Sequence, residues 1–362
     1  MAKHLQNDHY LFGVILLLVL FGLLMVFSAS AVVAERIHGA SYYFLKRQFL
    51  AVLIGLAGML LFMQLDYQRF RHPAVVLGFL SLVLVALVAV LFTGQRANTN
   101  RFFSLWGFSL QPSEFAKPAL ILFLAWFLEK RYRNVMEWRT FGPVAFLLLL
   151  IAALVLAGRD LGTAVVLIAI AGVILWVAGL NGRYLAAGAA ILLPLTAVFV
   201  LIEPYRRERF LIFLDPWKDP LGKGFQIIQS MIALGTGGFL GAGPMASKQK
   251  LYYLPAPHTD FIFSVIGEEF GLWGTTVLLV LFGWILWRGV QASLRASEPF
   301  GMFLAVGVTA MLVCQAFLNM SVALNLAPTK GMPLPLISYG GSALIAALWS
   351  SGILLSVSQR SG

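Results

Sequence analysis

The chain has 362 residues, of which 60% are apolar or aromatic and only 11% are Asp, Glu, Lys or Arg. A soluble domain carries roughly 25% charged residues, so this composition excludes an ordinary soluble domain, a disordered chain and a small secreted module. The net charge is +11, and because the charges lie between apolar runs, they indicate anionic lipids or an anionic substrate rather than nucleic acid. The single cysteine, Cys314, permits neither an internal disulfide nor a cysteine-based metal site.

Ten apolar segments follow one another along the chain, and a membrane-spanning helix needs about 20 such residues. They predict an all-α, polytopic integral membrane protein of about ten transmembrane helices, forming one integral membrane domain over residues 1–362. The first segment resembles a signal peptide, but it is longer than the usual apolar core of about 7–15 residues, so we expect it to be retained. The segments are 11–32, 48–65, 73–93, 115–129, 142–157, 162–180, 184–203, 261–287, 301–325 and 334–357.

One connection, residues 204–260, is far longer than the others and carries seven Lys and Arg residues. Within it, Phe225 to Leu234 predicts a short amphipathic helix, and Gly235 to Gly243 predicts a glycine-rich turn region. Loops of this length are usually functional.

An even number of spans places both termini on one side of the membrane. That side holds eleven Lys and Arg residues, against eight in the short loops opposite, which favours cytoplasmic termini and an extracytoplasmic long loop. The seven basic residues of the long loop weaken this argument, so charge alone leaves the topology open. An anionic substrate would explain basic residues on the outer side.

Charges beside apolar segments are costly and are functional candidates. Asp260 lies where the long loop meets the eighth segment, and two interpretations stand. Either Thr259 or Asp260 caps the following helix, or Asp260 is a carboxylate at the mouth of a cavity that accepts a proton from a hydroxyl. Glu268 and Glu269 lie two turns deeper, and we interpret them as a buried structural network with basic or polar partners.

Two further motifs place charges at the ends of segments. Glu114 and Lys117 are spaced i, i+3 and can pair on one face of a helix, partly buried and facing a cavity, although the role of this pair could be structural. Asp160, in the tight turn from Gly158 to Ala164, is expected to cap the sixth helix and could also face the cavity.

The stretch from Asn325 to Ala343 is rich in proline and glycine, which predicts irregular backbone beside a membrane helix. Such backbone is tolerated only where it is buried in protein or lines a wet cavity. Lys330, its only charge, is either a solvated loop cation or a point charge that holds a phosphate. The sequence contains no Walker loop, dinucleotide fingerprint, metal-ligand cluster or nucleophile elbow, so no cofactor is evident.

Together these motifs resemble the SEDS family (shape, elongation, division and sporulation). The resemblance covers almost the whole chain, and the lysine of PTKGM is typical of the division members rather than the elongation members. It rests on GLLMVFSAS (22–30), QPSEFAKPA (111–119), GRDLGTA (158–164), residues 204–230, LPAPHTDFIFSVIGEE (254–269) and PTKGMPLPLISYGGS (328–342).

The resemblance implies ten transmembrane helices in the bacterial inner membrane, with both termini cytoplasmic and the long loop outside. It implies an enzyme that polymerises lipid II into the glycan strands of peptidoglycan at the division site. The implied partners are a class B penicillin-binding protein of the FtsI type, other division-complex proteins and membrane lipids.

The resemblance also assigns roles to residues. The family's proposed catalytic aspartate matches Asp260, which would activate the acceptor hydroxyl as a base. Lys330, Arg206 and Arg101 would stabilise the diphosphate leaving group, and a divalent cation (Mg or Mn) could share that charge, although no ligand cluster requires one. The other candidate substrate-binding residues are Glu114, Lys117, Asp160, His258, Thr259, Gln226, Gln229, Ser230 and Ser338.

Some positions depart from the family pattern, above all Ala256, where the family commonly has glutamate. Two alternative functions stay open: a flippase that moves lipid II across the membrane, and a non-catalytic scaffold for the partner synthase. The expected position of Asp260 at the outer rim, rather than at mid-membrane, favours transfer over transport.

Overall fold

A computed structural model describes residues 8–92, 101–105, 108–190, 194, 204–251, 254–329 and 331–360. Within these ranges the chain is a bundle of helices with one short antiparallel hairpin. Seven of the described helices are long and apolar enough to cross a membrane, which confirms the prediction of a polytopic, mainly helical membrane protein. The seven are α1 (His9–His38), α2 (Tyr43–Gln64), α3 (Pro73–Leu91), α5 (Trp138–Ala157), α10 (Ile262–Arg295), α11 (Pro299–Ala323) and α12 (Gly341–Arg360).

Two more of the expected spans are also helices, but each differs from the seven above in one respect. The helix α4 (Pro112–Glu129) contains three charged residues, and α6 (Leu161–Val177) is apolar but shorter. Of the expected span 184–203, residues 184–190 are helical, and most of the remainder lies outside the described residues. The smaller elements are η1 (Tyr67–Arg71), β1 (Phe103–Leu105), β2 (Phe108–Leu110), η2 (Tyr132–Asn134), α8 (Pro204–Leu214), η3 (Pro216–Lys218) and α9 (Phe225–Gly237).

Local signals in the sequence set several helix ends. Asp8 caps α1 by accepting a hydrogen bond from the Leu11 N–H at 3.1 Å, which satisfies one of the free donors of the first turn. Proline at the first helical position begins α3, α4 and α11, where the missing N–H costs nothing. Gly39 ends α1 in the left-handed conformation with φ 64°.

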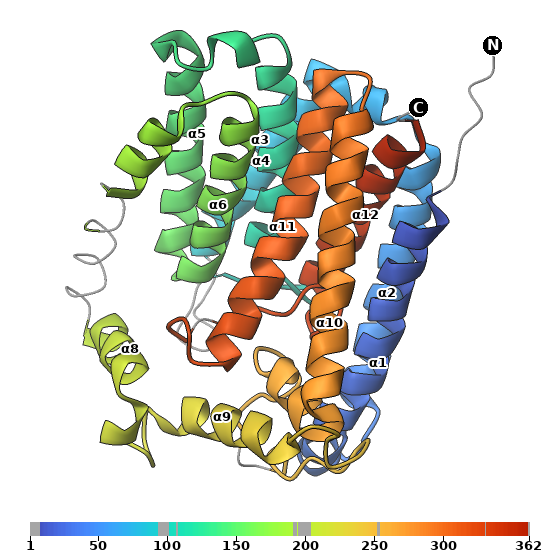
Figure 1. Cartoon of the computed structure of the whole chain (residues 1–362), viewed down its shortest axis with the longest axis vertical. Helices are drawn as coiled ribbons and strands as arrows, with labels where there is room; N and C mark the ends of the chain where they lie inside the picture. The colour runs from blue at the N-terminus through green and yellow to red at the C-terminus, as the bar shows by residue number, and fades with distance from the viewer. Residues whose placement is uncertain are drawn as a thin grey trace.

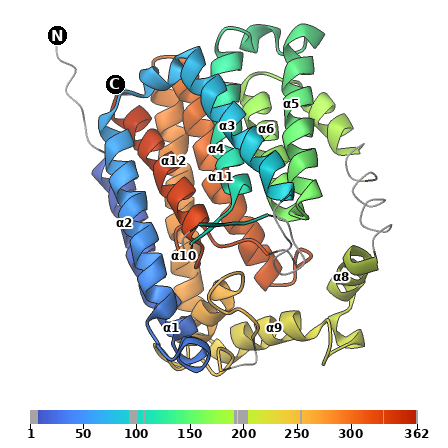
Figure 2. The same ribbon diagram turned by 180° about the vertical axis from the view of Figure 1, so that it is seen from behind.

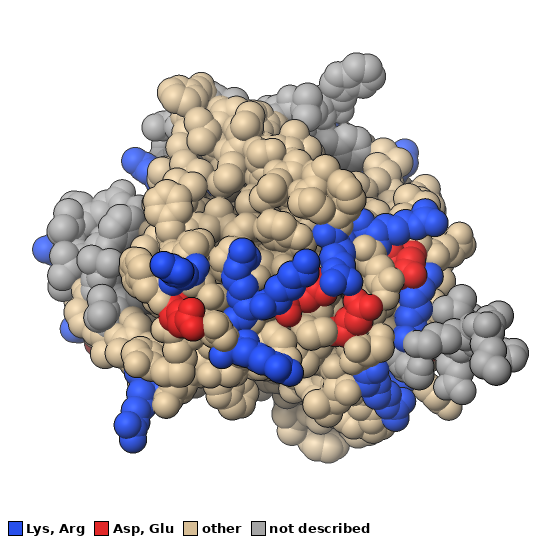
Figure 3. All heavy atoms as spheres, turned by 90° about the horizontal axis from the view of Figure 1, so that it is seen from above, with Lys and Arg blue, Asp and Glu red and all other residues tan. Residues whose placement is uncertain are grey.

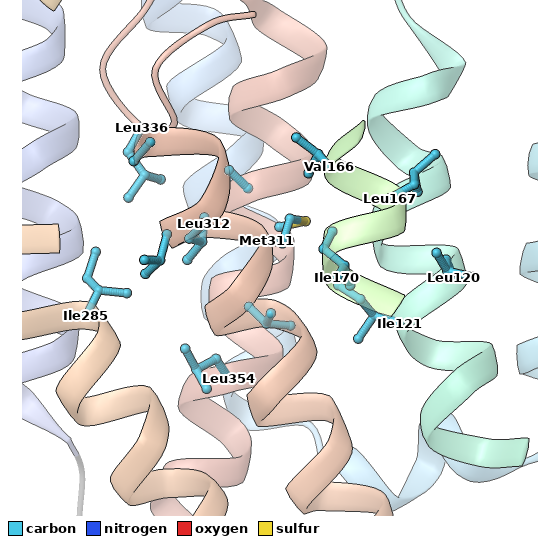
Figure 4. Close-up of a cluster of buried hydrophobic side chains, with 14 of the residues drawn as sticks. Leu120, Ile121, Val166, Leu167, Ile170, Ile285, Met311, Leu312, Leu336 and Leu354 are labelled. Carbon is cyan, nitrogen blue, oxygen red and sulfur yellow. The ribbon is translucent and has the colours of Figure 1, made fainter. Parts of the chain in front are cut away.

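The central element of the bundle is α11, which packs against α4, α6, α10 and α12. Its apolar side chains interdigitate with those of α4 and α6 on one side and α10 and α12 on the other (Figure 4). Most residues in the apolar stretch of α11 are buried, whereas fewer than half of those in the apolar stretches of α1, α2, α3 and α10 are. An outward apolar surface is stable in lipid and not in water, so this burial pattern agrees with a membrane bundle.

The start of α1 and the end of α12 lie at one end of the bundle, and α8 and α9 lie at the other (Figures 1 and 2). The expected amphipathic helix is confirmed as α9. Lys and Arg side chains gather across the face that carries the chain ends (Figure 3). That both termini share one side of the membrane stays a prediction, with which the positions of α1 and α12 agree.

The largest differences from the predicted bounds are in two helices. The last span begins at Gly341 and not at residue 334, because Pro333 and Pro335 keep the preceding residues in irregular backbone. The eighth span runs on to Arg295 and contains a break at Gly271, with φ 64° and ψ −159°. A Cβ atom on Gly271 would lie 2.5 Å from the Gly241 nitrogen, so both the conformation and the close packing of the long loop require glycine there.

Candidate functional site

Asp260 lies just before α10, at the end of the long loop that contains α8 and α9. The N-cap of α10 is Phe261, and no side chain caps this helix. The hydroxyl of Thr259 donates instead to the Ala256 carbonyl oxygen at 3.0 Å. The interpretation that Thr259 or Asp260 caps the helix is therefore wrong, and the Asp260 carboxylate is not committed to helix formation.

Asp260 is half-buried, and two guanidinium groups act on the charge of its carboxylate. Burial raises its pKa to about 6, while the positive charges of Arg101 and Arg209 lower the pKa and the negative charge of Asp160 raises it. The Oδ2 atom of Asp260 and the Nη2 atom of Arg101 border the same small space beside Gly331. At neutral pH the carboxylate is mostly ionised, yet its pKa is close enough to 7 for a general base.

The segment that carries Asp260 is fixed to the irregular segment 331–340. The Ser338 hydroxyl donates to the Thr259 carbonyl oxygen at 2.6 Å, and the Tyr339 N–H donates to the His258 carbonyl oxygen at 2.9 Å. The ring of His258 is buried against Phe44 and Tyr339, with ring centroids 4.5 and 5.4 Å away. This burial lowers the pKa of His258 to about 4, so the imidazole is neutral at pH 7.

Asp160 both caps α6 and orients groups near Arg101. Its Oδ1 atom accepts from the Thr163 N–H at 3.1 Å and lies 3.9 Å from the Arg101 Nη1 atom. Its Oδ2 atom accepts from the Gln111 amide at 2.8 Å and from the Ser113 hydroxyl at 3.1 Å. Arg101 and Asp160 line one small cavity. The cap interpretation of Asp160 is confirmed, while its place in the cavity of the functional site stays a prediction.

Glu114 and Lys117 form the predicted ion pair on α4, at 2.6 Å, and both side chains are buried. The ammonium group also donates to the Gln315 side-chain oxygen at 2.6 Å. These three side chains line a cavity that has room for about one water molecule and not for a sugar.

Glu268 and Glu269 have the basic and polar partners that the sequence predicts. Lys250 pairs with Glu269 at 2.7 Å, and the Ser28 hydroxyl donates to the same carboxylate at 2.7 Å. Glu268 accepts from the Ser247 hydroxyl and from backbone N–H groups of the long loop. This network ties the loop to α1 and α10.

The structure places the other predicted residues as follows. Lys330 and the side chain of Arg206 lie outside the described residues. Ser230 is buried in helix packing, 2.6 Å from the Ser264 hydroxyl and 2.7 Å from the Ala323 carbonyl oxygen. Gln226 and Gln229 are half-buried on α9.

Sequence reasoning missed Arg209, which lies one helical turn after Arg206 on α8. Its Nη1 atom is 3.4 Å from the Thr329 carbonyl oxygen, in the segment that precedes Gly331, and its charge acts on Asp260. The signal was present in the three arginines of the stretch 206–209, but the sequence does not say which of them faces Asp260.

Across the described part of the chain, no group of three or more His, Cys, Asp or Glu side chains could hold a metal ion. The basic groups around Asp260 could instead bind an anionic ligand. The site therefore combines one carboxylate of raised pKa with two cations.

Comparisons with known proteins agree with this site. Residues 8–362 match the profile of a family described as cell cycle proteins and named for FtsW, RodA and SpoVE. The probable peptidoglycan glycosyltransferase FtsW of Geobacter metallireducens is 44% identical, over 94% of this chain and 91% of its own length. The stage V sporulation protein E of Bacillus subtilis is 40% identical, over 99% of both chains.

Solved structures show the same fold. A chain from a peptidoglycan synthase complex that coordinates polymerization and crosslinking is 36% identical, with a TM-score of 0.80 over 99% of both chains. The rod shape determining protein RodA of Thermus thermophilus is 29% identical, with a TM-score of 0.73 over 98% of this chain and 97% of its own.

Proposed function

Because the chain belongs to this family of cell cycle proteins, which is the SEDS family, we propose that it is a peptidoglycan glycosyltransferase that polymerises lipid II. The observation that carries the proposal is the Asp260 carboxylate, which caps no helix and whose pKa is lowered by the positive charges of Arg101 and Arg209. Relatives 40–44% identical to this chain over 94–98% of its length are named probable peptidoglycan glycosyltransferases.

Asp260 acts as the base in this proposal. The carboxylate takes the proton from the acceptor sugar's hydroxyl, whose oxygen attacks the anomeric carbon of the donor sugar. The bond between that carbon and the diphosphate oxygen breaks, and the lipid diphosphate leaves with the electron pair. A single displacement of this kind inverts the anomeric configuration.

Arg101, Arg209 and the predicted cations Lys330 and Arg206 stabilise the charge that develops on the diphosphate. A guanidinium matches the two oxygens of a phosphate and stays charged at every working pH. A divalent cation, Mg or Mn, would share the charge of the diphosphate when bound; among the described residues no cluster of His, Cys, Asp or Glu marks a site for it.

The topology of the proposal puts both termini in the cytoplasm of a bacterium and Asp260 on the outer side of the inner membrane, at the division site. The basic face at the ends of the chain supports this orientation (Figure 3), because cytoplasmic loops carry an excess of Lys and Arg. We propose a class B penicillin-binding protein as the crosslinking partner, with other division proteins, because the similar solved chain belongs to a peptidoglycan synthase complex.

The test is polymerisation of lipid II by the purified protein with its cognate penicillin-binding protein, whose crosslinking activity is blocked. We expect glycan polymer from the parent and none from Asp260→Asn. Polymer from both would remove Asp260 from the reaction. Movement of lipid II across vesicles without polymer would establish the flippase function instead, and unaltered cell division with Asp260→Asn would favour a scaffold.

A further inference from the structure

Two buried amides on α11, Gln315 and Asn319, point at the segments that form the site. They are spaced i, i+4 and therefore share one face of the helix. The Asn319 amide donates to the Met332 carbonyl oxygen at 2.7 Å and to the Asp260 carbonyl oxygen at 2.9 Å. The Gln315 amide donates to the Pro333 carbonyl oxygen at 3.0 Å.

The Asn319 side chain of α11 thus joins the segment that carries Asp260 to the irregular segment 331–340. Asn319 holds the backbone of Asp260 to the backbone of Met332. Met332 directly follows Gly331, where a Cβ atom would lie 3.0 Å from the Asp260 Oδ2 atom. Residues 331–340 have no regular helix or strand to fix their path. Their separation from Asp260 therefore depends on side-chain donors such as these.

The charged pair on α4 determines which way the Gln315 amide points. Lys117 donates to the Gln315 oxygen at 2.6 Å, and an ammonium group can only donate. The Gln315 oxygen must face Lys117, so its NH₂ group faces Pro333. Glu114 in turn holds Lys117 at 2.6 Å, and the cavity beside this pair has room for about one water molecule.

We propose that Gln315 and Asn319 are positioning residues that hold Asp260 and the 331–333 backbone at a fixed separation, and that Glu114 and Lys117 act through Gln315. The inference rests on the proposed function, because it assigns these residues a part in presenting the Asp260 carboxylate to the acceptor hydroxyl. None of the four touches the substrate in this account. An apolar side chain of similar size would fill the same space on α11 without fixing the site.

The test compares Asn319→Leu and Gln315→Leu with a matched control on the same helix, Thr309→Val. Thr309 is also buried, and its hydroxyl has no hydrogen-bond partner among the described residues. With lipid II and the partner present, we expect Asn319→Leu to lower kcat by about tenfold or more with KM within about twofold, since positioning acts on the transition state. Gln315→Leu should lower kcat by a smaller factor, and the control should change neither value.

Two readouts separate positioning from a general loss of structure. The midpoint of the acid limb of the pH profile should move toward the ordinary aspartate value in Asn319→Leu, because a loosened segment admits water. Hydrogen exchange should rise in peptides covering 254–262 and 331–340 of Asn319→Leu and in neither peptide of Thr309→Val.

Each possible outcome either supports or overturns the proposal. A kcat for Asn319→Leu within about twofold of the parent, an unchanged exchange pattern, or an equal loss in Thr309→Val would overturn the proposal. If the parent itself makes no polymer, the proposed function fails, and the exchange measurement alone then decides whether the two amides hold the segments together.

Discussion

The Oδ2 atom of Asp260 lies 3.0 Å from the point where a Cβ atom on Gly331 would sit. That distance is shorter than ordinary van der Waals contact, so the carboxylate occupies the space that a side chain at residue 331 would need. The relationship joins two motifs that are separated by seventy residues in the chain, and it gives a direct way to move the carboxylate without replacing it.

Substituting Gly331→Ala should displace the Asp260 carboxylate by a few tenths of an ångström and lower kcat by about threefold to tenfold, because a shift of about 1 Å in a reacting group can cost about a hundredfold. The measurement is the rate of glycan synthesis from lipid II. Gly340→Ala is the matched control, because its Cβ would meet its nearest neighbour at 3.6 Å, an ordinary contact. Equal rates for the two variants would show that the carboxylate is not confined by residue 331.

Glycan synthesis should fall as the pH drops through about 6, the pKa to which burial raises Asp260. Activity needs the ionised carboxylate, so the rate is full above this pKa and is lost below it. The sign for stability is the opposite: a raised carboxyl pKa stabilises the folded protein below the ordinary aspartate pKa, and this contribution disappears as the pH rises through about 6. A rate that stays constant between pH 5 and 7 would contradict the assignment of Asp260 as the base.

Two charge substitutions near Asp260 should move this midpoint in opposite directions. Arg101 lowers the pKa of Asp260 and Asp160 raises it, so Arg101→Gln should shift the midpoint to higher pH and Asp160→Asn to lower pH. The midpoint is measured from kcat/KM against pH for each variant. Arg295→Gln, at the opposite end of α10, is the control and should leave the midpoint where it is. An equal shift in Arg101→Gln and Arg295→Gln, which change the net charge by the same amount, would indicate an effect of net charge and not a local one.

Replacing Lys250 with methionine should destabilise the protein by about 3–5 kcal/mol, because it leaves the buried Glu269 carboxylate without its cation. Thermal unfolding in detergent measures the loss. Lys248→Met provides the comparison, since Lys248 is exposed and its N–H bond to Glu268 is made by the backbone. The double variant Lys250→Met with Glu269→Gln should recover much of the loss, and no recovery would mean that Lys250 acts by packing alone.

The sequence by itself determined the features that depend on neighbouring residues. Apolar runs of sufficient length located the spans, and the i, i+3 spacing of Glu114 and Lys117 placed their charges on one helical face. Asp160 capped the helix that follows it, and the acids at 268 and 269 had to find partners because a buried charge without one is too costly. In each case the physical cause acts within a few turns of the chain.

Only the tertiary structure decided which distant segments meet. It showed that Asp260 does not cap α10, that Arg209 acts on Asp260, and that Asn319 bonds to a carbonyl oxygen 59 residues away. A local pattern cannot supply these facts, because a carboxylate before a helix looks the same whether it bonds to that helix or faces a guanidinium from another segment. Helix packing around α11 brings the segments together, and the packing depends on the side chains of four other helices at once.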